Sequence, residues 1–241
     1  MTKTLPQIRC QGRSNCFACG LRHEMVCSDV SLDDLIDFHA GIEDFDYEHG
    51  SAIYHMGAPM EAVYCVRGGA VKMVRYDPAG EQRIVRVLKT GDVAGIESAF
   101  AEHYEHTAIA VGRVRACRIP ISYFRKFVSD HGGLQMRLLR KSQEALREAE
   151  TWLSQLMGGT TPARTRMARL FLRLRAVEGG DKIHRFSLED IAAIIGITPE
   201  TASRVISDFV RQGILVKGGN SYATRFFRGD IPALEKVAQE V

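Results

Sequence analysis

Residues 134–157 read LQMRLLRKSQEALREAETWLSQLM and predict one long helix, around which the rest of the chain is organised. The stretch has no Gly or Pro and is rich in Leu, Arg, Glu, Gln and Ala, which favour helices. Glycine pairs flank it at 132–133 and 158–159, and Pro162 follows. At about 1.5 Å per residue, this helix would be roughly 36 Å long.

One face of this helix is predicted to be a dimerisation seam. Its residues follow one another at alternating steps of four and three, the a/d spacing of two packed helices. They are Leu138, Ser142, Ala145, Ala149, Trp152 and Leu156. The alternative is a core helix packed on its own domain, but the length of the stretch and its small central residues favour a dimer.

Length and charge narrow the class of protein. The 241 residues can form two domains, and the net charge of +3 is unevenly placed. From Gly158 onward there are 13 Lys and Arg against 9 Asp and Glu, whereas the first 157 residues carry 19 against 20. A basic C-terminal part suits a polyanion. Without an apolar run of membrane-spanning length or a leader, we expect a cytoplasmic protein with no membrane partner.

The first thirty residues contain a cluster of cysteines, CQGRSNCFACGLRHEMVC at 10–27. Cys16 and Cys19 form a C-x2-C pair, and Cys27 follows after seven residues. Bunched cysteines in a chain without a leader indicate a metal or redox site rather than disulfides. A C-x2-C turn directs two thiolates to one point, which suits zinc or an iron–sulfur cluster. The alternative is a set of free thiols on a mobile segment.

A four-thiolate site needs a fourth cysteine, and the sequence offers Cys10, Cys65 and Cys117. Cys65 lies in the predicted strand 63–66 and fits a core position. Alternation along 113–117 places Cys117 on the same face as two arginines, so this thiol can meet an N-terminal loop laid over the sheet. A half-buried structural cysteine is the alternative for Cys117.

The middle of the chain predicts a β-rich domain. Its short β-branched segments, at 62–69, 70–88 and 106–120, are punctuated by Gly, Pro and Asp. Strands at this spacing favour a sandwich or barrel over βαβ units. Residues 76–81 are predicted to form a hairpin loop. A short helix over 31–41, capped by Ser31, precedes the strands.

The last third predicts a winged helix-turn-helix. Thr161 and Pro162 should start a helix that continues to about Val177. Ser187 should cap the next helix, and Gly196 should turn the chain into another that starts at 198–199. Residues 214–222 then predict a strand, a turn and a second strand.

The helix after Gly196 is the candidate for base recognition. Its apolar residues form one stripe, which leaves the other face for DNA. The candidate contacts on that face are Glu200, Ser203, Arg204 and Ser207. Arg204 can donate two hydrogen bonds to guanine, and Glu200 can accept one from cytosine. Lys217 should lie near backbone phosphate. An ordinary solvated helix face is the alternative.

The order of these segments resembles the CRP/FNR superfamily of transcription regulators over nearly the whole chain. Two motifs are similar to its oxygen-sensing FNR branch. ITPETASR at 197–204 matches E-x-x-S-R of the recognition helix. The C-x2-C-x7-C set, together with Cys117 followed by Arg-Ile-Pro, looks like the FNR ligands of a [4Fe–4S] cluster. The seven-residue gap is similar to one FNR subgroup, and Cys10 has no place in the pattern.

The resemblance implies an α+β fold with four segments. They are a cysteine-rich segment (1–30), a cupin-like, cyclic-nucleotide-binding-type β-roll sensor domain (31–132), a dimerisation helix (133–158) and a winged helix-turn-helix domain (159–241). It implies a homodimer on a palindromic, TTGAT-like DNA site, with a [4Fe–4S] cluster on Cys16, Cys19, Cys27 and Cys117 that controls dimerisation. Oxygen would convert or destroy the cluster and return the chain to the monomer. RNA polymerase is an implied partner, through the hairpin at 77–81.

Other functions are expected to be absent or remain as alternatives. Cyclic-AMP binders of this fold use Gly-Glu-Leu and Arg-Ser/Thr-Ala, whereas the matching places read GDV at 91–93 and HTA at 106–108. We therefore expect no cyclic nucleotide, since the phosphate would lack its arginine. The chain shows no nucleophile–base set, phosphate loop or paired carboxylates, so no enzyme is expected. The alternative regulator holds structural zinc or a thiol-redox site at these cysteines.

Overall fold

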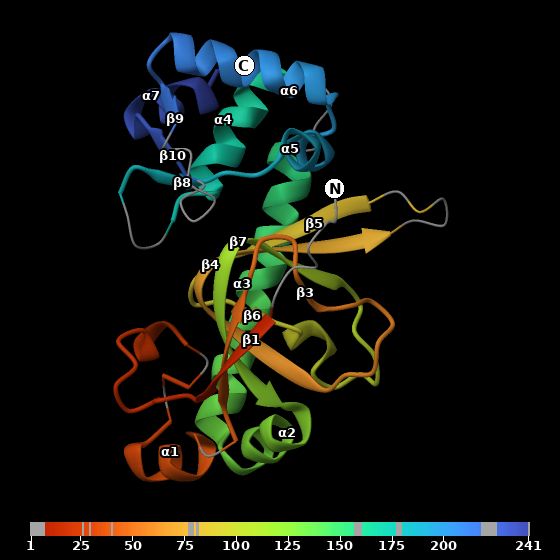
Figure 1. Cartoon of the computed structure of the whole chain (residues 1–241), viewed down its shortest axis with the longest axis vertical. Helices are drawn as coiled ribbons and strands as arrows, with labels where there is room; N and C mark the ends of the chain where they lie inside the picture. Colours follow the sequence, from red (N-terminus) through yellow and green to blue (C-terminus); the bar gives the residue numbers. More distant parts are fainter. Residues whose placement is uncertain are drawn as a thin grey trace. The chain divides into compact units, whose positions relative to one another are not determined.

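The computed structural model describes residues 8–25, 27–28, 30–39, 41–76, 80, 82–156, 161–176, 180–217 and 226–240. The chain divides into two compact units (Figure 1). The first comprises residues 1–75 and 88–146, and the second comprises residues 76–87 and 147–241. The first is rich in strands and the second in helices, as the predicted α+β class requires.

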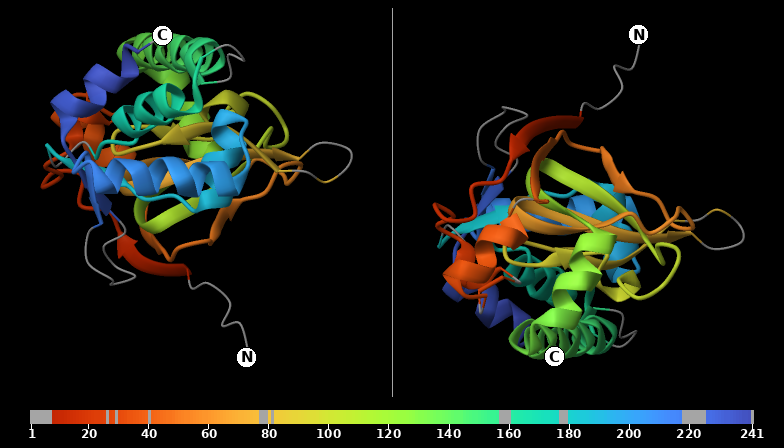
Figure 2. Two further views of the ribbon diagram at one scale, coloured as in Figure 1. Left: turned by 90° about the horizontal axis from the view of Figure 1, so that it is seen from above. Right: turned by 90° about the horizontal axis from the view of Figure 1, so that it is seen from below.

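A seven-stranded sheet forms the roll, and its strands curve around one interior rather than lying flat (Figure 2). The strands are β1 (Ile8–Arg13), β2 (Glu43–Tyr47), β3 (Ala52–Tyr54), β4 (Ala62–Tyr76), β5 (Gln82–Leu88), β6 (Val93–Ala94) and β7 (Thr107–Pro120). Their order is β1-β2-β7-β4-β5, with β3 paired to β7 and β6 to β4. Small and β-branched side chains such as Val66, Val74, Ala110 and Val114 fill the interior and are almost fully buried. The β-rich middle domain is therefore confirmed.

Strand β4 is longer than the sequence pattern indicated, because it continues through a glycine pair that was expected to end it. Its pairing with β7 shifts register on either side of Gly68. Gly69 has a φ of +89°, and a Cβ at this position would lie 2.4 Å from the carbonyl oxygen of Arg113. Only glycine fits such a close backbone approach, so the pair bends the strand rather than ending it.

The helices of the first unit include one that was predicted. Helix α1 (Leu32–His39) begins as expected after Ser31, whose hydroxyl accepts a hydrogen bond of 3.1 Å from the Asp34 amide. Strand β1 and helix α2 (Ile121–Asp130) were not predicted. Two short 3-10 turns, η1 (Arg22–Glu24) and η2 (Ile96–Ser98), complete this unit.

Helix α3 (Gly132–Leu156) confirms the long helix but corrects the predicted seam. Leu138, Trp152 and Leu156 are 7%, 4% and 0% exposed, so these large side chains pack inside the chain. Ala145 and Ala149 are half-buried beside them. The face chosen from the sequence is therefore the one that α3 turns toward its own chain.

A second stripe on α3 is exposed instead. Its large apolar members are Met136, Leu139, Leu146 and Leu153, whose exposed fractions range from 51% to 63%. Exposed Gln143 and Glu150 complete the same pattern of alternating steps of three and four. We call these six positions the exposed stripe. It lies roughly a third of a turn around the helix from the predicted seam.

The second unit has the helix-turn-helix that the sequence predicted. It contains α4 (Ala163–Arg173), α5 (Leu188–Ile195), α6 (Pro199–Arg211) and α7 (Ile231–Ala238). Ser187 caps α5 by accepting from the Asp190 amide, and Thr198 caps α6 by accepting from the Thr201 amide. Gly196 turns the chain between them with a φ of 65°. These predictions are confirmed.

The boundaries of α4 and of the small sheet differ from the prediction. Pro162 occupies the N-cap position and gives no side-chain hydrogen bond, so Thr161 does not cap the helix. A sheet of β8 (Lys182–His184), β10 (Phe226–Gly229) and β9 (Leu215–Lys217), in that order, follows α4 and α6. Strand β8 was not predicted, and the predicted second wing strand lies outside the described residues. In the described part of the chain, no helix is long and apolar enough to span a bilayer.

Candidate functional site

Three of the predicted ligands share the loop between β1 and α1. Cys16 is buried, and Cys19 and Cys27 are half-buried. A backbone turn connects the first two, because the Cys19 amide donates to the Cys16 carbonyl at 3.4 Å. Burial, and then the neighbouring Cys27 and Cys19 thiols, raise the pKa of Cys16 to about 12. The Cys27 and Cys19 thiols thus lie near enough to Cys16 to disfavour its thiolate form.

A carboxylate connects this loop to the fourth predicted ligand. Asp44 lies on β2 opposite Cys117 on β7, and the Cys117 thiol donates to its Oδ1 at 3.4 Å. Arg67 donates to its Oδ2 at 2.5 Å. Ser14, which follows β1 and is two residues before Cys16, also donates to this carboxylate. Asp44 therefore ties the start of the cysteine loop to Cys117.

Arg67 is the cation of this network. Burial alone would lower the pKa of Arg67, but Asp44 and the thiols of Cys117 and Cys19 raise it. Burial is also the main reason why the pKa of Cys117 is raised to about 12. The Arg67 guanidinium therefore interacts electrostatically both with the cysteine loop, through Cys19, and with Cys117 on β7.

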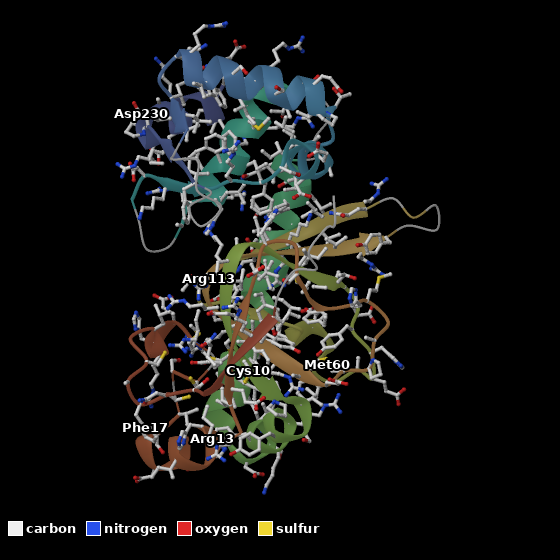
Figure 3. All side chains as sticks on the ribbon, viewed as in Figure 1. Cys10, Arg13, Phe17, Met60, Arg113 and Asp230 are labelled. Carbon is white, nitrogen blue, oxygen red and sulfur yellow. The ribbon has the colours of Figure 1, made fainter. Side chains whose placement is uncertain are left out.

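The other cysteines are placed differently. Cys65 is 3% exposed and lies opposite Cys117 in the β4–β7 register. Cys10 is exposed on β1. It lies away from Phe17, a residue of the loop between Cys16 and Cys19 (Figure 3). Among the described residues, no three His, Cys, Asp or Glu side chains are arranged as a metal site.

The sequence prediction missed Ser14, Asp44 and Arg67. Each is an ordinary polar residue in its local pattern, and no spacing motif links the three. Their association depends on the pairing of β2 with β7, which brings Asp44 to Cys117. In the sequence, only the strand alternation that points Cys117 outward indicated this part of the sheet.

The cysteine loop also contacts the long helix. Arg137 on α3 donates from Nη2 to the carbonyl oxygen of His23 at 3.4 Å, and His23 lies between Cys19 and Cys27 in the sequence. One turn along α3, Lys141 donates to the carbonyl oxygen of Gly91 at 3.3 Å. A rearrangement of the loop would therefore act directly on the helix that carries the exposed stripe.

Asp44→Asn is expected to destabilise the metal-free protein by about 1–3 kcal/mol near pH 7, because Arg67, Ser14 and Cys117 lose their charged acceptor. Burial alone would raise the pKa of Asp44, but the hydrogen bonds from Ser14 and Arg67 hold it below its usual range. The stabilisation is therefore complete above the unfolded pKa of about 4 and is lost as the pH falls below it. Urea unfolding of both proteins at about pH 7 and about pH 3 measures the change.

Asp46→Asn is the control for this prediction. Asp46 lies on the same strand, and its side chain is 13% exposed, but its two donors, Arg113 and Gln11, are both exposed. Its interactions should therefore contribute less than about 1 kcal/mol. The role given to Asp44 would be contradicted if both substitutions lowered the free energy of unfolding equally. It would also be contradicted if the loss caused by Asp44→Asn were as large at about pH 3 as at about pH 7.

The second candidate site is the outer face of α6. Glu200, Ser203, Arg204 and Ser207 are all exposed there, as predicted. The first three, together with Leu188 and Pro199, line a hollow of about 430 Å³. The backbone at Glu200 and the Thr198 hydroxyl lower the pKa of Glu200, so it is an anion at neutral pH. Lys217 ends β9, but its side chain lies outside the described residues.

Two family models match different parts of the chain. Residues 45–131 match the cyclic nucleotide-binding domain, and residues 165–235 match the Crp-like helix-turn-helix domain. This pairing of a roll with a DNA-binding module decides the family. The chain is a DNA-binding transcription regulator of the CRP/FNR family. As a member of that family, it is not an enzyme.

Relatives of this CRP/FNR regulator are similar over most of their length. It is 25% identical to the CRP-like cAMP-activated global transcriptional regulator of Mycobacterium tuberculosis, over 75% of this chain and 83% of that protein. It is also 25% identical to the transcriptional activator protein anr of Pseudomonas aeruginosa, over 90% and 88%. The solved structure of FixK2 from Bradyrhizobium japonicum matches with a TM-score of 0.69 and 27% identity, over 83% and 98%. The CRP/FNR fold class is thus confirmed.

Proposed function

We propose that this CRP/FNR regulator senses oxygen through a [4Fe–4S] cluster on Cys16, Cys19, Cys27 and Cys117, and that the cluster controls dimerisation on a palindromic TTGAT-like site. The observation that carries the proposal is the position of the cysteine loop. Asp44 ties the loop to Cys117, and Arg137 ties it to the long helix. A group held by all four thiols would therefore act on sheet and helix together.

The residues present suit an iron–sulfur cluster. Four cysteine thiolates are the usual ligand set, and such a cluster with its thiolates is an anion. The Arg67 guanidinium, whose pKa is already raised by the Cys117 and Cys19 thiols, would offset that negative charge. When bound, the cluster would supply sensitivity to oxygen. For ligation, Cys117 would have to leave Asp44, which would retain Ser14 and Arg67 as donors.

The loop can then control the helix through contacts already in place. Arg137 holds the His23 carbonyl, so closing the loop around a ligand pulls on the first half of α3. Met136 and Leu139, beside Arg137, belong to the exposed stripe. We propose the exposed stripe as the homodimer interface, because its large apolar side chains are not covered by the chain itself. A small change in the packing of α3 would therefore alter this interface. A few kcal/mol are enough to shift such an equilibrium.

The raised pKa values of Cys16, Cys27 and Cys117 favour a metal over the thiol-redox alternative. Thiolates are the reactive form, but burial and neighbouring thiols keep Cys16 protonated, with its pKa at about 12. A bound metal displaces such protons, so the same burial does not prevent ligation. Zinc remains the alternative metal.

Anaerobic purification separates the proposal from the zinc alternative. We expect a brown protein with about four iron and four acid-labile sulfide per chain, whose visible absorbance and dimer fraction both fall in air. Zinc is colourless and indifferent to oxygen. A colourless protein with one zinc and an unchanged dimer fraction in air would overturn the proposal.

The roll also supports the proposed absence of a cyclic nucleotide. At the place where a phosphate-binding arginine would stand, His106 pairs with Glu97 at 3.3 Å. The Thr107 hydroxyl, next along the chain, accepts a hydrogen bond from the Met56 amide at 3.0 Å. A phosphate would meet the Glu97 carboxylate there instead of a bidentate cation. Residues 77–79 and 81 of the hairpin at 77–81, a proposed contact for RNA polymerase, lie outside the described residues.

Arg204→Ala is expected to weaken binding by about 5- to 150-fold at sites with the preferred guanine and to remove preference at that base pair alone. The reason is that Arg204 is exposed in the first turns of α6 and can donate two hydrogen bonds to guanine. The proposed role of Glu200 is to accept from the cytosine paired nearby. Titrations of anaerobic protein against every single substitution of the half-site measure the preference.

Arg211→Ala is the matched control for Arg204→Ala. Arg211 is equally a surface arginine of α6, but it lies in the last turn and pairs with Asp208. Its loss should leave base preference unchanged. If Arg204→Ala lowers all affinities equally, Arg204 contacts phosphate and the assignment is wrong.

A further inference from the structure

An apolar residue, Leu188, lies beside the residues of α6 that we propose to contact DNA bases. Leu188 is the first residue of α5 and is 36% exposed, whereas Ile191 and Ile195 on the same helix are buried in the core. Leu188 lines the hollow together with Pro199, the first residue of α6. The two helix starts thus place two apolar side chains among the candidate base-reading groups.

The other residues that line the hollow are polar, so the hollow has both apolar and polar walls. Ser203 supplies a hydroxyl, and Arg204 and Glu200 supply opposite charges. In the major groove, thymine presents the O4 acceptor next to its C5 methyl group, whereas cytosine presents an amino donor and no methyl group. An apolar surface beside a hydroxyl and a guanidinium donor matches the edge of thymine better than that of cytosine.

We propose that Leu188 and Pro199 form a contact for a thymine methyl group, at a base pair next to those recognised by Glu200 and Arg204. This inference rests on the proposed DNA reading by α6. Leu188 is the specificity-determining residue, because its side chain is exposed at the hollow, whereas Ile191 and Ile195 of the same helix are buried. Backbone phosphate could accept from the backbone amides at the start of α5, but the Leu188 side chain itself offers phosphate neither charge nor hydrogen bond.

Replacing thymine by deoxyuridine tests the contact, because the substitution removes the methyl group and keeps every hydrogen-bonding atom. Each thymine of a bound half-site is replaced in turn, and the affinity of the anaerobic, full-length protein is titrated. We expect one position to lose about four-fold, the value of one buried methyl group. The Leu188→Ala variant should bind the unmodified site about as weakly as the wild type binds the site with deoxyuridine at that position. It should no longer distinguish thymine from deoxyuridine there.

Val216→Ala is the matched control. Val216 is an exposed apolar residue of the same unit, at 57%, but it lies on β9 and does not line the hollow. This variant should keep the wild-type response to deoxyuridine. Leu188→Met, which keeps an apolar side chain, should keep most of it.

The outcomes separate this inference from the proposed function. If the wild type distinguishes half-sites but no deoxyuridine position matters, or if Leu188→Ala keeps the response, the methyl contact is wrong and base reading by α6 stands. If the wild type shows no sequence preference on any duplex, the proposed reading of DNA fails and this inference fails with it.

Discussion

Leu146→Asp is expected to raise the dimer dissociation constant of the cluster-loaded protein by at least about 100-fold. Leu146 lies in the middle of the exposed stripe and is 62% exposed in the single chain. Burial of a leucine contributes about 1.5–3 kcal/mol, and a symmetric dimer loses this twice. The new carboxylates would also face each other across the interface. Sedimentation equilibrium under nitrogen measures the constant, and binding to a palindromic site should fall with it.

Two further variants make this test specific. Phe100→Asp removes an apolar side chain that is 73% exposed but lies outside α3, so it should leave dimerisation unchanged. Glu150→Ala removes a charge from the exposed stripe itself and should increase the dimer fraction in air, since like charges would no longer meet. If Leu146→Asp leaves the dimer intact, the exposed stripe is not the interface.

Cys→Ser substitutions at the four proposed ligands are each expected to abolish the anaerobic visible absorbance and most of the bound iron. A serine hydroxyl is a much weaker ligand for iron than a thiolate, and four thiolates are the usual ligand set of such a cluster. Iron and acid-labile sulfide are measured per chain, after circular dichroism has shown that each variant is folded. The affected residues should be Cys16, Cys19, Cys27 and Cys117.

Cys65→Ser and Cys10→Ser are the controls for this series. Cys65 faces Cys117 across the same strand pair, so its substitution disturbs the same part of the roll without removing a ligand. Cys10 is exposed on β1. If Cys117→Ser keeps its iron and Cys10→Ser loses it, Cys10 is the fourth ligand.

Local sequence chemistry predicted the elements of the DNA-binding unit well. Ser187, Gly196 and Thr198 each act through a bond or a backbone angle within a few residues, so their effect is visible in the sequence. Thr161 failed as a cap although it has the right type, because the chain places Pro162 at that position. Strand β8 is short and depends on pairing with β10, which is distant in the sequence.

The choice of helix face shows where periodicity stops being informative. Steps of three and four link Leu138 to Leu156, and they equally link Met136 to Leu153. Helix period alone cannot say which stripe meets the chain's own domain and which remains exposed. That depends on the shape of the surface beneath α3. Burial of Trp152 decides it, since the largest apolar side chain of the helix lies inside.

The cysteine site was predictable only in part. Spacing identified the loop thiols, and strand alternation pointed Cys117 toward the N-terminal segment. The network of Ser14, Asp44 and Arg67 joins three strands or strand ends, and strand register, which the sequence does not state, brings them together. The carboxylate that holds Cys117 was therefore invisible until the sheet was known.

The exposed stripe on α3 has a consequence for how much protein a cell must make. If two copies must pair through it before they bind DNA, the amount of active regulator follows mass action rather than the copy number alone. Where most chains are single, halving their number reduces the pairs about four-fold. Under the proposed oxygen sensing, expression level would then set the oxygen tension at which target genes respond, and any control over synthesis of this protein would retune that threshold without altering its chemistry.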